Sequence, residues 1–404
     1  MRILQINCVY ALGSTGKIVQ DITNSCISRG DDVIVLYGRQ GRDITPNVIK
    51  VSSEIEAKLH SLMSRLTGLD FGYSPLATKK VVKIIKTFNP DIVHLHCLNG
   101  HFINVFNLVE YLKQKSIPTV LTLHAEIMHT AGCEHAYECT KWIEECYDCN
   151  RIKGKLTHYF RDDARFAYKK MKRAFDAFPN LVVVGVSDWL TNRAKQSSIF
   201  RNCNAQFITI ENGLDLKSFA PIPFNENPLR NRFEGNSPVI LHVTPNFCHP
   251  LKGGMFVLEL AKLHPEWVFV IVGYNGEEEL PSNVITIHHT QSKEELSWYY
   301  NIATLTLLTS KRETFSMVCA ESLACGTPIV GFKAGGPESV FVGEFAKFVE
   351  FGNMIALDNA MKTMIRENHV VDTSMIHERF TADRMADKYR ICYINLKRYK
   401  INHI

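Results

Sequence analysis

Residues 3–37 read ILQINCVYALGSTGKIVQDITNSCISRGDDVIVLY, and this stretch has the pattern of a β-α-β unit. A short strand is predicted over 3–7, a glycine turn over 13–16 and a second strand over 33–37. Between the turn and Gly30, which is typical of a helix end, apolar residues recur at helical spacing. These residues are Ile18, Val19, Ile22, Cys26 and Ile27.

The same alternation of strands and helices continues along the chain. Further strands are predicted over 92–95, 119–123 and 181–184 and, in a second series, over 239–243, 268–272, 284–287, 305–308 and 328–330. Short apolar strands separated by helices indicate parallel sheets covered on both faces. A Pro- and Asn-rich linker is predicted over 221–228. We therefore expect an α/β protein of two Rossmann-like doubly wound domains, 1–215 and 216–404, with a ligand cleft between them at the ends of the strands.

The composition is that of an ordinary globular protein. Of the 404 residues, 46% are apolar and 22% are charged, and the formal net charge is +5. This mild positive excess suits an acidic ligand or an anionic membrane surface, but it is too weak to indicate nucleic-acid binding. No export signal and no apolar run of about 20 residues is visible, so we expect a cytosolic protein with mostly reduced cysteines.

Two glutamates frame the most informative segment, which reads TSKRETFSMVCAE over 309–321. A helix is predicted to begin near Ser316, and the free amides of its first turn could bind a diphosphate. Glu321 would lie in an apolar stretch of that helix, where a ribose diol could satisfy its carboxylate. On spacing alone the alternative is equally open, namely that Glu321 faces solvent and Glu313 is an ordinary loop acid.

The residues after this segment favour a ligand site. They read SLACGTPIV over 322–330 and GGPE over 335–338. The first motif provides a helix end and a strand. The second provides a glycine turn that allows a ligand to approach the backbone.

Together these motifs resemble those of the family-4 retaining glycosyltransferases, in particular the group that builds bacterial surface polysaccharides such as O-antigen, capsule or colanic acid. The resemblance extends to GSTG at 13–16, IENGLD at 210–215 and TQSKEEL at 290–296, so it covers most of the chain. It implies two Rossmann-like domains that face a central cleft, and a C-terminal helix that returns toward the N-terminal domain.

The resemblance also implies roles for individual residues. Glu321 would hold the nucleotide ribose, Glu313 would lie beside the donor sugar, and Lys252 would neutralise the leaving diphosphate. From the residues alone, Lys252 could equally be a solvated loop lysine. The remaining expected donor contacts are Gly13 and Gly16 near the phosphates and the amides near Thr314, Phe315 and Ser316.

His124 follows the predicted strand 119–123, where the family usually has a histidine close to the donor sugar. The resemblance therefore implies a catalytic role for His124 together with Glu313 and Lys252, whereas a hydrogen-bonded structural histidine is the alternative. The chain departs from its near relatives at Ala125, where they often have Asp, and Glu126 follows. It also lacks an arginine over 246–249, where His249 could take its place.

Four cysteines crowd into 17 residues of the first predicted domain: Cys133, Cys139, Cys146 and Cys149. Reduced cysteines at this density predict a structural zinc site, and relatives carry a similar cluster. The spacing before Cys139 is looser than in most zinc ribbons, so a redox-labile pair or a packed, metal-free loop is an alternative. Four thiolates would leave no open position for catalysis, and the cluster could instead shape the acceptor side of the cleft.

Basic residues are concentrated between Arg151 and Arg173, with aromatic residues interleaved. This pattern predicts either an amphipathic helix that rests on anionic lipid or a surface helix with a basic outer face. A lipid-linked acceptor, which the resemblance implies, would make peripheral contact with the inner face of the cell membrane natural.

The expected reaction is transfer of a hexosyl group from a nucleotide-diphosphate sugar to a sugar hydroxyl, with retention at the anomeric carbon. No residue is a convincing covalent nucleophile, so the leaving diphosphate is expected to help deprotonate the acceptor, and no metal is expected to be required. A nucleotide-sugar epimerase on the same fold and a non-catalytic binding subunit are the alternatives. A dehydrogenase is disfavoured because GSTG is not Gly-x-Gly-x-x-Gly and no acid ends the second strand.

Overall fold

The computed structural model describes residues 1–149, 163–233, 235, 237–277, 279–290, 292–368 and 371–401. The chain divides into two compact units, one formed by Met1–Glu211 with Ala382–Ile404 and the other by Asn212–Thr381. The domain boundary predicted after residue 215 lies four residues beyond the observed boundary after Glu211. The prediction also placed the terminal helix in the second domain. In the structure, that helix is part of the first unit.

The first unit contains a seven-stranded sheet with the order β3-β2-β1-β4-β5-β6-β7, in which every pairing is parallel. The strands are β1 (Arg2–Asn7), β2 (Asp32–Tyr37), β3 (Val48–Lys50), β4 (Ile92–Leu95), β5 (Thr119–Leu123), β6 (Leu181–Gly185) and β7 (Gln206–Thr209). The predicted parallel sheet is confirmed. In this sheet the sequence did not predict β3 and β7, which are the short edge strands and lack a continuous apolar run.

The helices of the first unit are α1 (Gly13–Ser28), α2 (Glu54–Thr67), α3 (Pro75–Phe88), α4 (Val105–Gln114), α5 (Ile127–Thr130), α7 (Ala164–Phe175), α8 (Asp188–Gln196) and α15 (Ala382–Ile401). Helix α1 begins at Gly13, so the stretch predicted as a glycine turn is the first turn of this helix.

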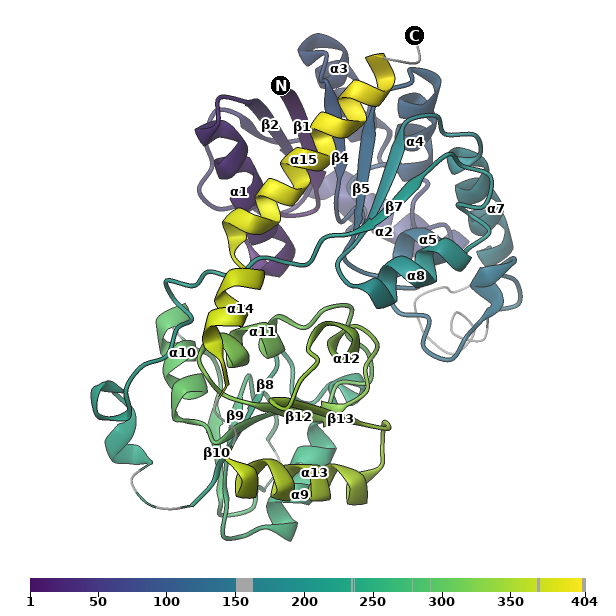
Figure 1. Cartoon of the computed structure of the whole chain (residues 1–404). Coiled ribbons are helices and arrows are strands. Elements are labelled where there is room, and N and C mark those ends of the chain that lie inside the picture. The colour runs from purple at the N-terminus through teal and green to yellow at the C-terminus, as the bar shows by residue number, and fades with distance from the viewer. Residues whose placement is uncertain are drawn as a thin grey trace. The chain divides into compact units, whose positions relative to one another are not determined.

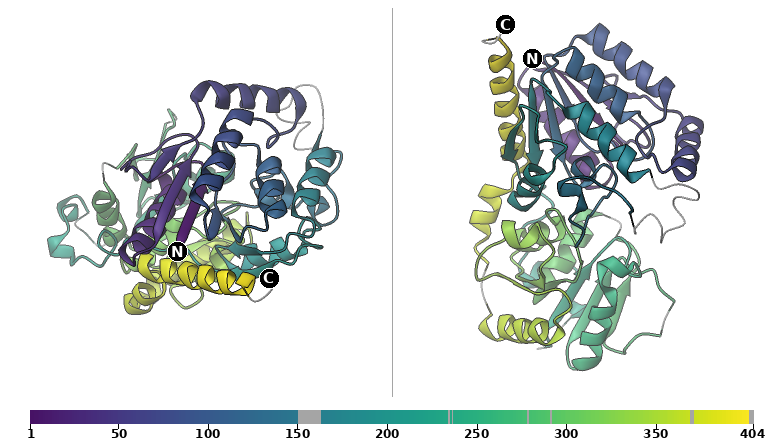
Figure 2. Two further views of the ribbon diagram at one scale, coloured as in Figure 1. Left: turned by 90° about the horizontal axis from the view of Figure 1, so that it is seen from above. Right: turned by 90° about the vertical axis from the view of Figure 1, so that its right-hand side faces the viewer.

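Helix α15 completes the core of the first unit, which confirms that the C-terminal helix returns to the N-terminal domain. Its buried face carries Met385, Tyr389, Cys392, Tyr393 and Leu396, which recur at helical spacing. These side chains share one cluster with the apolar face of α1 and with strands of the sheet. Figures 1 and 2 show α15, in yellow, beside the purple elements at the start of the chain.

The second unit contains a six-stranded parallel sheet with the order β10-β9-β8-β11-β12-β13. Its strands are β8 (Val239–Val243), β9 (Val268–Val272), β10 (Val284–Ile287), β11 (Leu305–Leu308), β12 (Ile329–Phe332) and β13 (Ala346–Val349). Its α-helices are α9 (Gly254–Leu263), α10 (Lys293–Ile302), α11 (Met317–Ala324), α12 (Pro337–Val340), α13 (Met354–Glu367) and α14 (Thr373–Arg379). Two Rossmann-like sheets in one chain confirm the predicted fold class.

The linker predicted over 221–228 is not the boundary between the units, and this prediction is wrong. Asn227 is fully buried in the second unit, where its side chain donates to the Trp298 carbonyl at 3.0 Å. The amide of Ile222 donates to Asn301 at 2.6 Å. The Pro- and Asn-rich composition reflects irregular backbone that packs through side-chain hydrogen bonds, and not a free connection.

Candidate active site

The carboxylate loop of the second unit, residues 309–316, connects β11 to α11. The Ser316 hydroxyl accepts a hydrogen bond from the Cys319 amide at 3.3 Å and caps α11. Ser316 has a φ of 77°, which is unusual for a residue other than glycine and is typical of backbone held in place at a functional site. The predicted start of the helix near Ser316 is confirmed.

The glycine turn at 335–336 holds this loop in place. The Glu313 amide donates to the Ala334 carbonyl at 3.0 Å, and the Gly336 amide donates to the Glu313 carbonyl at 2.9 Å. A Cβ atom at Gly336 would collide with the carbonyl of Thr314, so a side chain at this position would displace the loop. The Glu338 carboxylate accepts from the Gly335 amide at 2.8 Å. The motif GGPE therefore supports the carboxylate loop.

Lys252 and Glu313 meet in this unit. Lys252 ends a 3-10 turn (Pro250–Lys252) that follows β8, and its Nζ lies 2.7 Å from Oε1 of Glu313. The two side chains are 30% and 23% exposed, so the pair is open to a ligand. His249 Nδ1 accepts from the Leu251 amide and caps the same turn, so in this structure His249 supports the backbone that carries Lys252.

Glu321 lies on the partly buried side of α11. Its Oε2 atom accepts a hydrogen bond from the Tyr300 hydroxyl at 3.0 Å, and burial raises its pKa to about 7. Glu321 is partly exposed, so its carboxylate can still contact a ligand. The alternative that Glu321 is an ordinary solvent-facing acid does not fit this environment. Tyr300 on α10 is a hydrogen-bond partner of Glu321 that the sequence did not indicate.

In the first unit, His124 follows β5 and lies beside His96, which follows β4. Nε2 of His124 is 3.3 Å from Nδ1 of His96. Burial lowers the pKa of His124 to about 4, so its imidazole is neutral near pH 7. His124 is partly exposed and His96 is fully buried. The sequence does not single out His96, because a histidine beside an apolar run carries no motif.

Gly13 and Gly16 lie in the first turn of α1, at the carboxyl end of β1. No side chain caps this turn, so its amide groups are not used by a capping residue. A Cβ atom at Gly16 would lie 3.1 Å from the Ala11 nitrogen, so the loop packs closely against this position. The predicted glycines therefore belong to the first unit, as His124 does, whereas Lys252 and the two glutamates belong to the second.

The four-cysteine loop follows α5. The Cys146 thiol lies 3.6 Å from the Thr130 carbonyl, and its pKa is raised to about 12 by burial and by the nearby Cys133, Cys139 and Cys149. Within the part of the chain that the structure describes, no group of three or more His, Cys, Asp or Glu side chains is placed to hold a metal ion. The structural zinc site therefore stays a prediction from the cysteine spacing.

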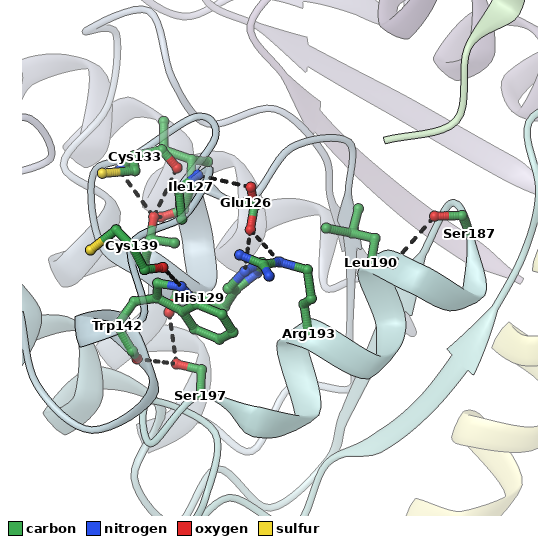
Figure 3. A network of polar contacts seen from close by, with 12 residues as sticks. Glu126, Ile127, His129, Cys133, Cys139, Trp142, Ser187, Leu190, Arg193 and Ser197 are labelled. Carbon is green, nitrogen blue, oxygen red and sulfur yellow. Dashed lines mark hydrogen bonds and ion pairs between the residues drawn. The ribbon is translucent and has the colours of Figure 1, made fainter. Parts of the chain in front are cut away.

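Figure 3 shows the buried ion pair that anchors this loop to α8. Glu126 is fully buried, its Oε1 atom lies 2.6 Å from Nε of Arg193, and its Oε2 atom accepts from the Ala136 amide at 2.8 Å. Burial opposes ionisation, but the contact with Nε2 of His129 at 3.5 Å and the charge of Arg193 lower the pKa of Glu126 to about 2. Glu126, which follows the departure at Ala125, therefore supports the fold.

A pocket of about 450 Å³ lies in the first unit beside the four-cysteine loop. Its lining includes Arg65 of α2, His101 from the segment after β4, and Cys133 and Cys146 of the loop. The proximity of the cysteines to a pocket agrees with the idea that they shape a binding surface. The contribution of α2 carried no sequence signal, because its lining residues are ordinary helix-surface residues.

The basic segment predicted between Arg151 and Arg173 is only partly described, because residues 151–162 lie outside the described residues. Helix α7 forms its second half. Tyr168, Met171 and Phe175 on the apolar face of α7 are buried in the first unit. In this part of the segment, the surface-helix interpretation fits better than an apolar face lying in lipid. No helix in the described ranges is both long and apolar enough to cross a membrane.

Comparison with known proteins supports the assignment from the motifs. The model of "Glycosyl transferases group 1" matches residues 230–377. N-acetyl-alpha-D-glucosaminyl L-malate synthase of Bacillus anthracis is 19% identical, over 97% of each chain. Sucrose-phosphate synthase from Thermosynechococcus elongatus has a TM-score of 0.70 at 16% identity, over 98% of each chain. Anabaena Alr3699/HepE in complex with UDP-glucose has a TM-score of 0.62 at 16% identity, over 98% of this chain and 100% of the other.

The second family model covers most of the first unit, without β1 and α15, and the crossing into the second. The model of "Glycosyltransferase Family 4" matches residues 15–218, which is half of the chain. The chain therefore belongs to the family 4 glycosyltransferases.

Proposed function

We propose that this glycosyltransferase moves a hexosyl group from a nucleotide-diphosphate sugar to a sugar hydroxyl, with retention at the anomeric carbon. The observation that carries the proposal is the ion pair of Lys252 with Glu313, at 2.7 Å, on the loop that leads into α11. An ammonium beside a helix N-terminus suits a diphosphate, because both supply positive potential to it. The neighbour HepE, whose complex contains UDP-glucose, supports a donor of this class.

The proposed chemistry follows from the charges of this site. As the bond between the anomeric carbon and the diphosphate oxygen breaks, its electron pair stays on the diphosphate, where Lys252 and the amides near Ser316 stabilise it. The acceptor hydroxyl forms the new bond on the same face and gives its proton to the leaving phosphate oxygen. Glu313 and His124 contact hydroxyls of the sugar, and Glu321 binds the ribose. The protein's contribution is thus orientation and electrostatic stabilisation.

We propose that the acceptor binds in the pocket beside α2, as part of a lipid-linked oligosaccharide for O-antigen, capsule or exopolysaccharide synthesis. Polar lining groups such as Asn99 and Ser61 suit sugar hydroxyls. Arg65 favours a second candidate, a small anionic acceptor, because a guanidinium binds carboxylate and phosphate groups. The name of the Bacillus anthracis relative contains such an acid, L-malate.

Helix α2 supports peripheral contact with an anionic membrane. Ile55, Leu59, Leu62 and Leu66 are exposed and lie on one face of α2 at spacings of three and four residues. Exposed basic residues lie on the same helix and on α3: Lys58, Arg65, Lys79, Lys80, Lys83 and Lys86. An apolar stripe flanked by basic residues is typical of a surface that lies on anionic lipid. The basic segment between Arg151 and Arg173 is thus one of two candidate contacts.

Leu59→Glu with Leu62→Glu is expected to reduce binding to vesicles of phosphatidylcholine mixed with phosphatidylglycerol at least about tenfold, since two leucines leave the lipid. Co-sedimentation measures this. Leu263→Glu, at an exposed leucine of α9, is the matched control and should bind as the unchanged protein does. Equal sedimentation of all three proteins would remove α2 from the membrane proposal.

A panel of nucleotide sugars and free nucleoside diphosphates tests the donor. A matching donor is expected to raise the unfolding temperature, because a ligand that binds only the native state stabilises it by about 3 kcal/mol at one hundred times its Kd. Transfer to a sugar acceptor should then release the nucleoside diphosphate. The transferred sugar should keep the α- or β-configuration that it had in the donor. Formation of an isomer without release would indicate the epimerase, and binding of a donor with no turnover would indicate a binding subunit.

A further inference from the structure

A chain of polar side chains leads from the interior of helix α1 to His124. The Thr23 hydroxyl donates to the Val19 carbonyl at 2.7 Å, and Nε2 of Gln5 donates to the Thr23 oxygen at 2.8 Å. Oε1 of Gln5 lies 3.0 Å from Nε2 of His96. Nδ1 of His96 lies 3.3 Å from Nε2 of His124, which ends the chain. All of these residues belong to the first unit.

Burial limits the hydrogen-bond partners of each group in this series of polar side chains. Gln5 is 0% exposed and Thr23 and His96 are each 1% exposed, so water does not replace a missing partner. Burial also lowers the pKa of His96 well below its usual range. A neutral imidazole has one N–H and one lone pair, so it donates from one nitrogen and accepts at the other. The direction of one contact therefore dictates the direction of the next.

The direction is set at Thr23. Its single hydroxyl hydrogen is given to the Val19 carbonyl, so its oxygen accepts from the amide of Gln5. The carbonyl oxygen of Gln5 therefore faces His96, which must donate from Nε2. Nδ1 of His96 then carries the lone pair, so His124 must donate to it from Nε2.

The neighbouring His94 does not compete for these hydrogens. The Thr122 hydroxyl donates to the Tyr389 oxygen at 3.1 Å, so it accepts from Nε2 of His94 at 2.7 Å. Nδ1 of His94 lies 2.6 Å from the Tyr393 hydroxyl and accepts its hydrogen. The ring of His94 packs against His96 with centroids 3.7 Å apart. Helix α15, through its two tyrosines, therefore supports the ring of His96 from one side.

We propose that Thr23, Gln5 and His96 are positioning residues that hold His124 as the neutral tautomer with its hydrogen on Nε2, so that Nδ1 of His124 acts only as a hydrogen-bond acceptor. The group that faces Nδ1 must then be a donor, and a sugar hydroxyl is such a group. The identity of the ligand, a sugar, rests on the proposed function. The tautomer of His124 does not. It assigns His124 to orienting a hydroxyl and not to delivering a proton.

The same series of polar side chains could also carry its hydrogen bonds in the opposite direction, and that arrangement differs from the observed one by one hydrogen bond. If the Thr23 hydroxyl turned toward Gln5, the amide of Gln5 would reverse, and both His96 and His124 would carry their hydrogens on Nδ1. The Val19 carbonyl would then lose only its hydrogen bond from the Thr23 hydroxyl, because it also accepts a backbone hydrogen bond inside α1. A change at Thr23, inside α1, should therefore alter the tautomer of His124.

Nuclear magnetic resonance of protein labelled with ¹⁵N in the histidine rings tests the proposal directly, because the two ring nitrogens give different signals in each tautomer. At pH 7.5 without any ligand, we expect His124 and His96 to be protonated on Nε2. The signals are assigned by their loss in His124→Gln and His96→Asn. A His124 that is protonated on Nδ1, or on both nitrogens, would overturn the proposal.

Thr23→Val keeps the shape of the side chain and removes the hydroxyl, so Gln5 loses its acceptor. We expect both histidines to switch to the Nδ1–H tautomer and kcat/KM for transfer to fall at least tenfold, whereas Thr23→Ser should keep the original spectrum and rate. An unchanged spectrum in Thr23→Val, or a switched spectrum with unchanged transfer, would contradict the proposal. If the tautomers are as expected but the unchanged protein transfers no sugar, the proposed function fails and the tautomer assignment stands.

Discussion

Lys252→Met is expected to lower kcat for sugar transfer by about 10²- to 10³-fold, the loss usually seen when one group that stabilises developing charge is removed. The change keeps most of the side-chain stem and removes the ammonium that lies 2.7 Å from Glu313. Because both members of the pair are partly exposed, the free energy of unfolding should change by no more than about 1 kcal/mol. Steady-state kinetics and thermal unfolding of the same preparation separate the two effects.

Lys262→Met is the matched control, because Lys262 is an exposed lysine on α9 of the same unit. It should leave both the rate and the stability unchanged. Near-normal transfer by Lys252→Met with the correct donor would show that Lys252 does not stabilise the leaving group, and the assignment of this site would then be wrong.

The double variant Lys252→Met with Glu313→Gln distinguishes two roles for Glu313. If Glu313 only holds the lysine in place, Glu313→Gln should cost nothing further once the lysine is gone. If Glu313 contacts the sugar, as we propose, the second change should lower the rate again, because the carboxylate contact is independent of the lysine. Comparison of the double variant with the two single variants gives the answer.

Much of the fold was predictable because it depends on local patterns. The central strands of both sheets are short apolar runs, and the helix that begins after Ser316 follows a polar loop and a capping residue. The glycine turn at 335–336 was also predictable. Only glycine fits at position 336, because the backbone of Thr314 lies against it. The edge strand β7 was not predictable, because its half-exposed residues carry no strong period.

The parts of the site that the sequence did not reveal depend on contacts between distant residues. Tyr300 bonds to Glu321 across 21 positions, Arg193 to Glu126 across 67, and His96 to Gln5 across 91. No local period brings such pairs together, because the order of strands in the sheet decides which residues become neighbours. Family motifs named Glu321 but not the burial that shifts its pKa, which is a property of the packed environment.

That burial makes Glu321→Gln the variant with the most unusual expected outcome, because it should raise stability while it weakens binding of the donor. In the folded protein the pKa of Glu321 is about 7, against an ordinary value of 4.5. Below pH 4.5, both the folded and the unfolded states hold the proton. Between the two pKa values only the folded state holds it, so stability falls as the pH rises, and above about pH 7 the full cost is present.

The cost of the ionised carboxylate is at most about 3.5 kcal/mol, since each unit of pKa corresponds to about 1.4 kcal/mol. Glutamine avoids this cost and can still accept the Tyr300 hydroxyl hydrogen bond. We therefore expect Glu321→Gln to unfold at a higher temperature than the unchanged protein at pH 8 and at the same temperature at pH 4. Thermal unfolding at the two pH values checks the sign. A lower stability of the variant at pH 8 would contradict the assigned environment.

Binding should change in the opposite direction, because the ionised carboxylate is the form that accepts two hydrogen bonds from a ribose diol. Glu321→Gln is expected to weaken binding of the matching nucleoside diphosphate by about a hundredfold, at roughly 1.5 kcal/mol for each lost charge-assisted bond. Titration calorimetry with UDP, GDP and ADP measures the loss, and Glu259→Gln, at an exposed glutamate of α9, is the matched control. In the unchanged protein the same reasoning predicts that nucleotide affinity rises as the pH passes through 7. The ribose therefore binds best at the pH at which the empty site is least stable, and equal affinity of the unchanged protein at pH 6 and pH 8 would rule out Glu321 as the ribose ligand.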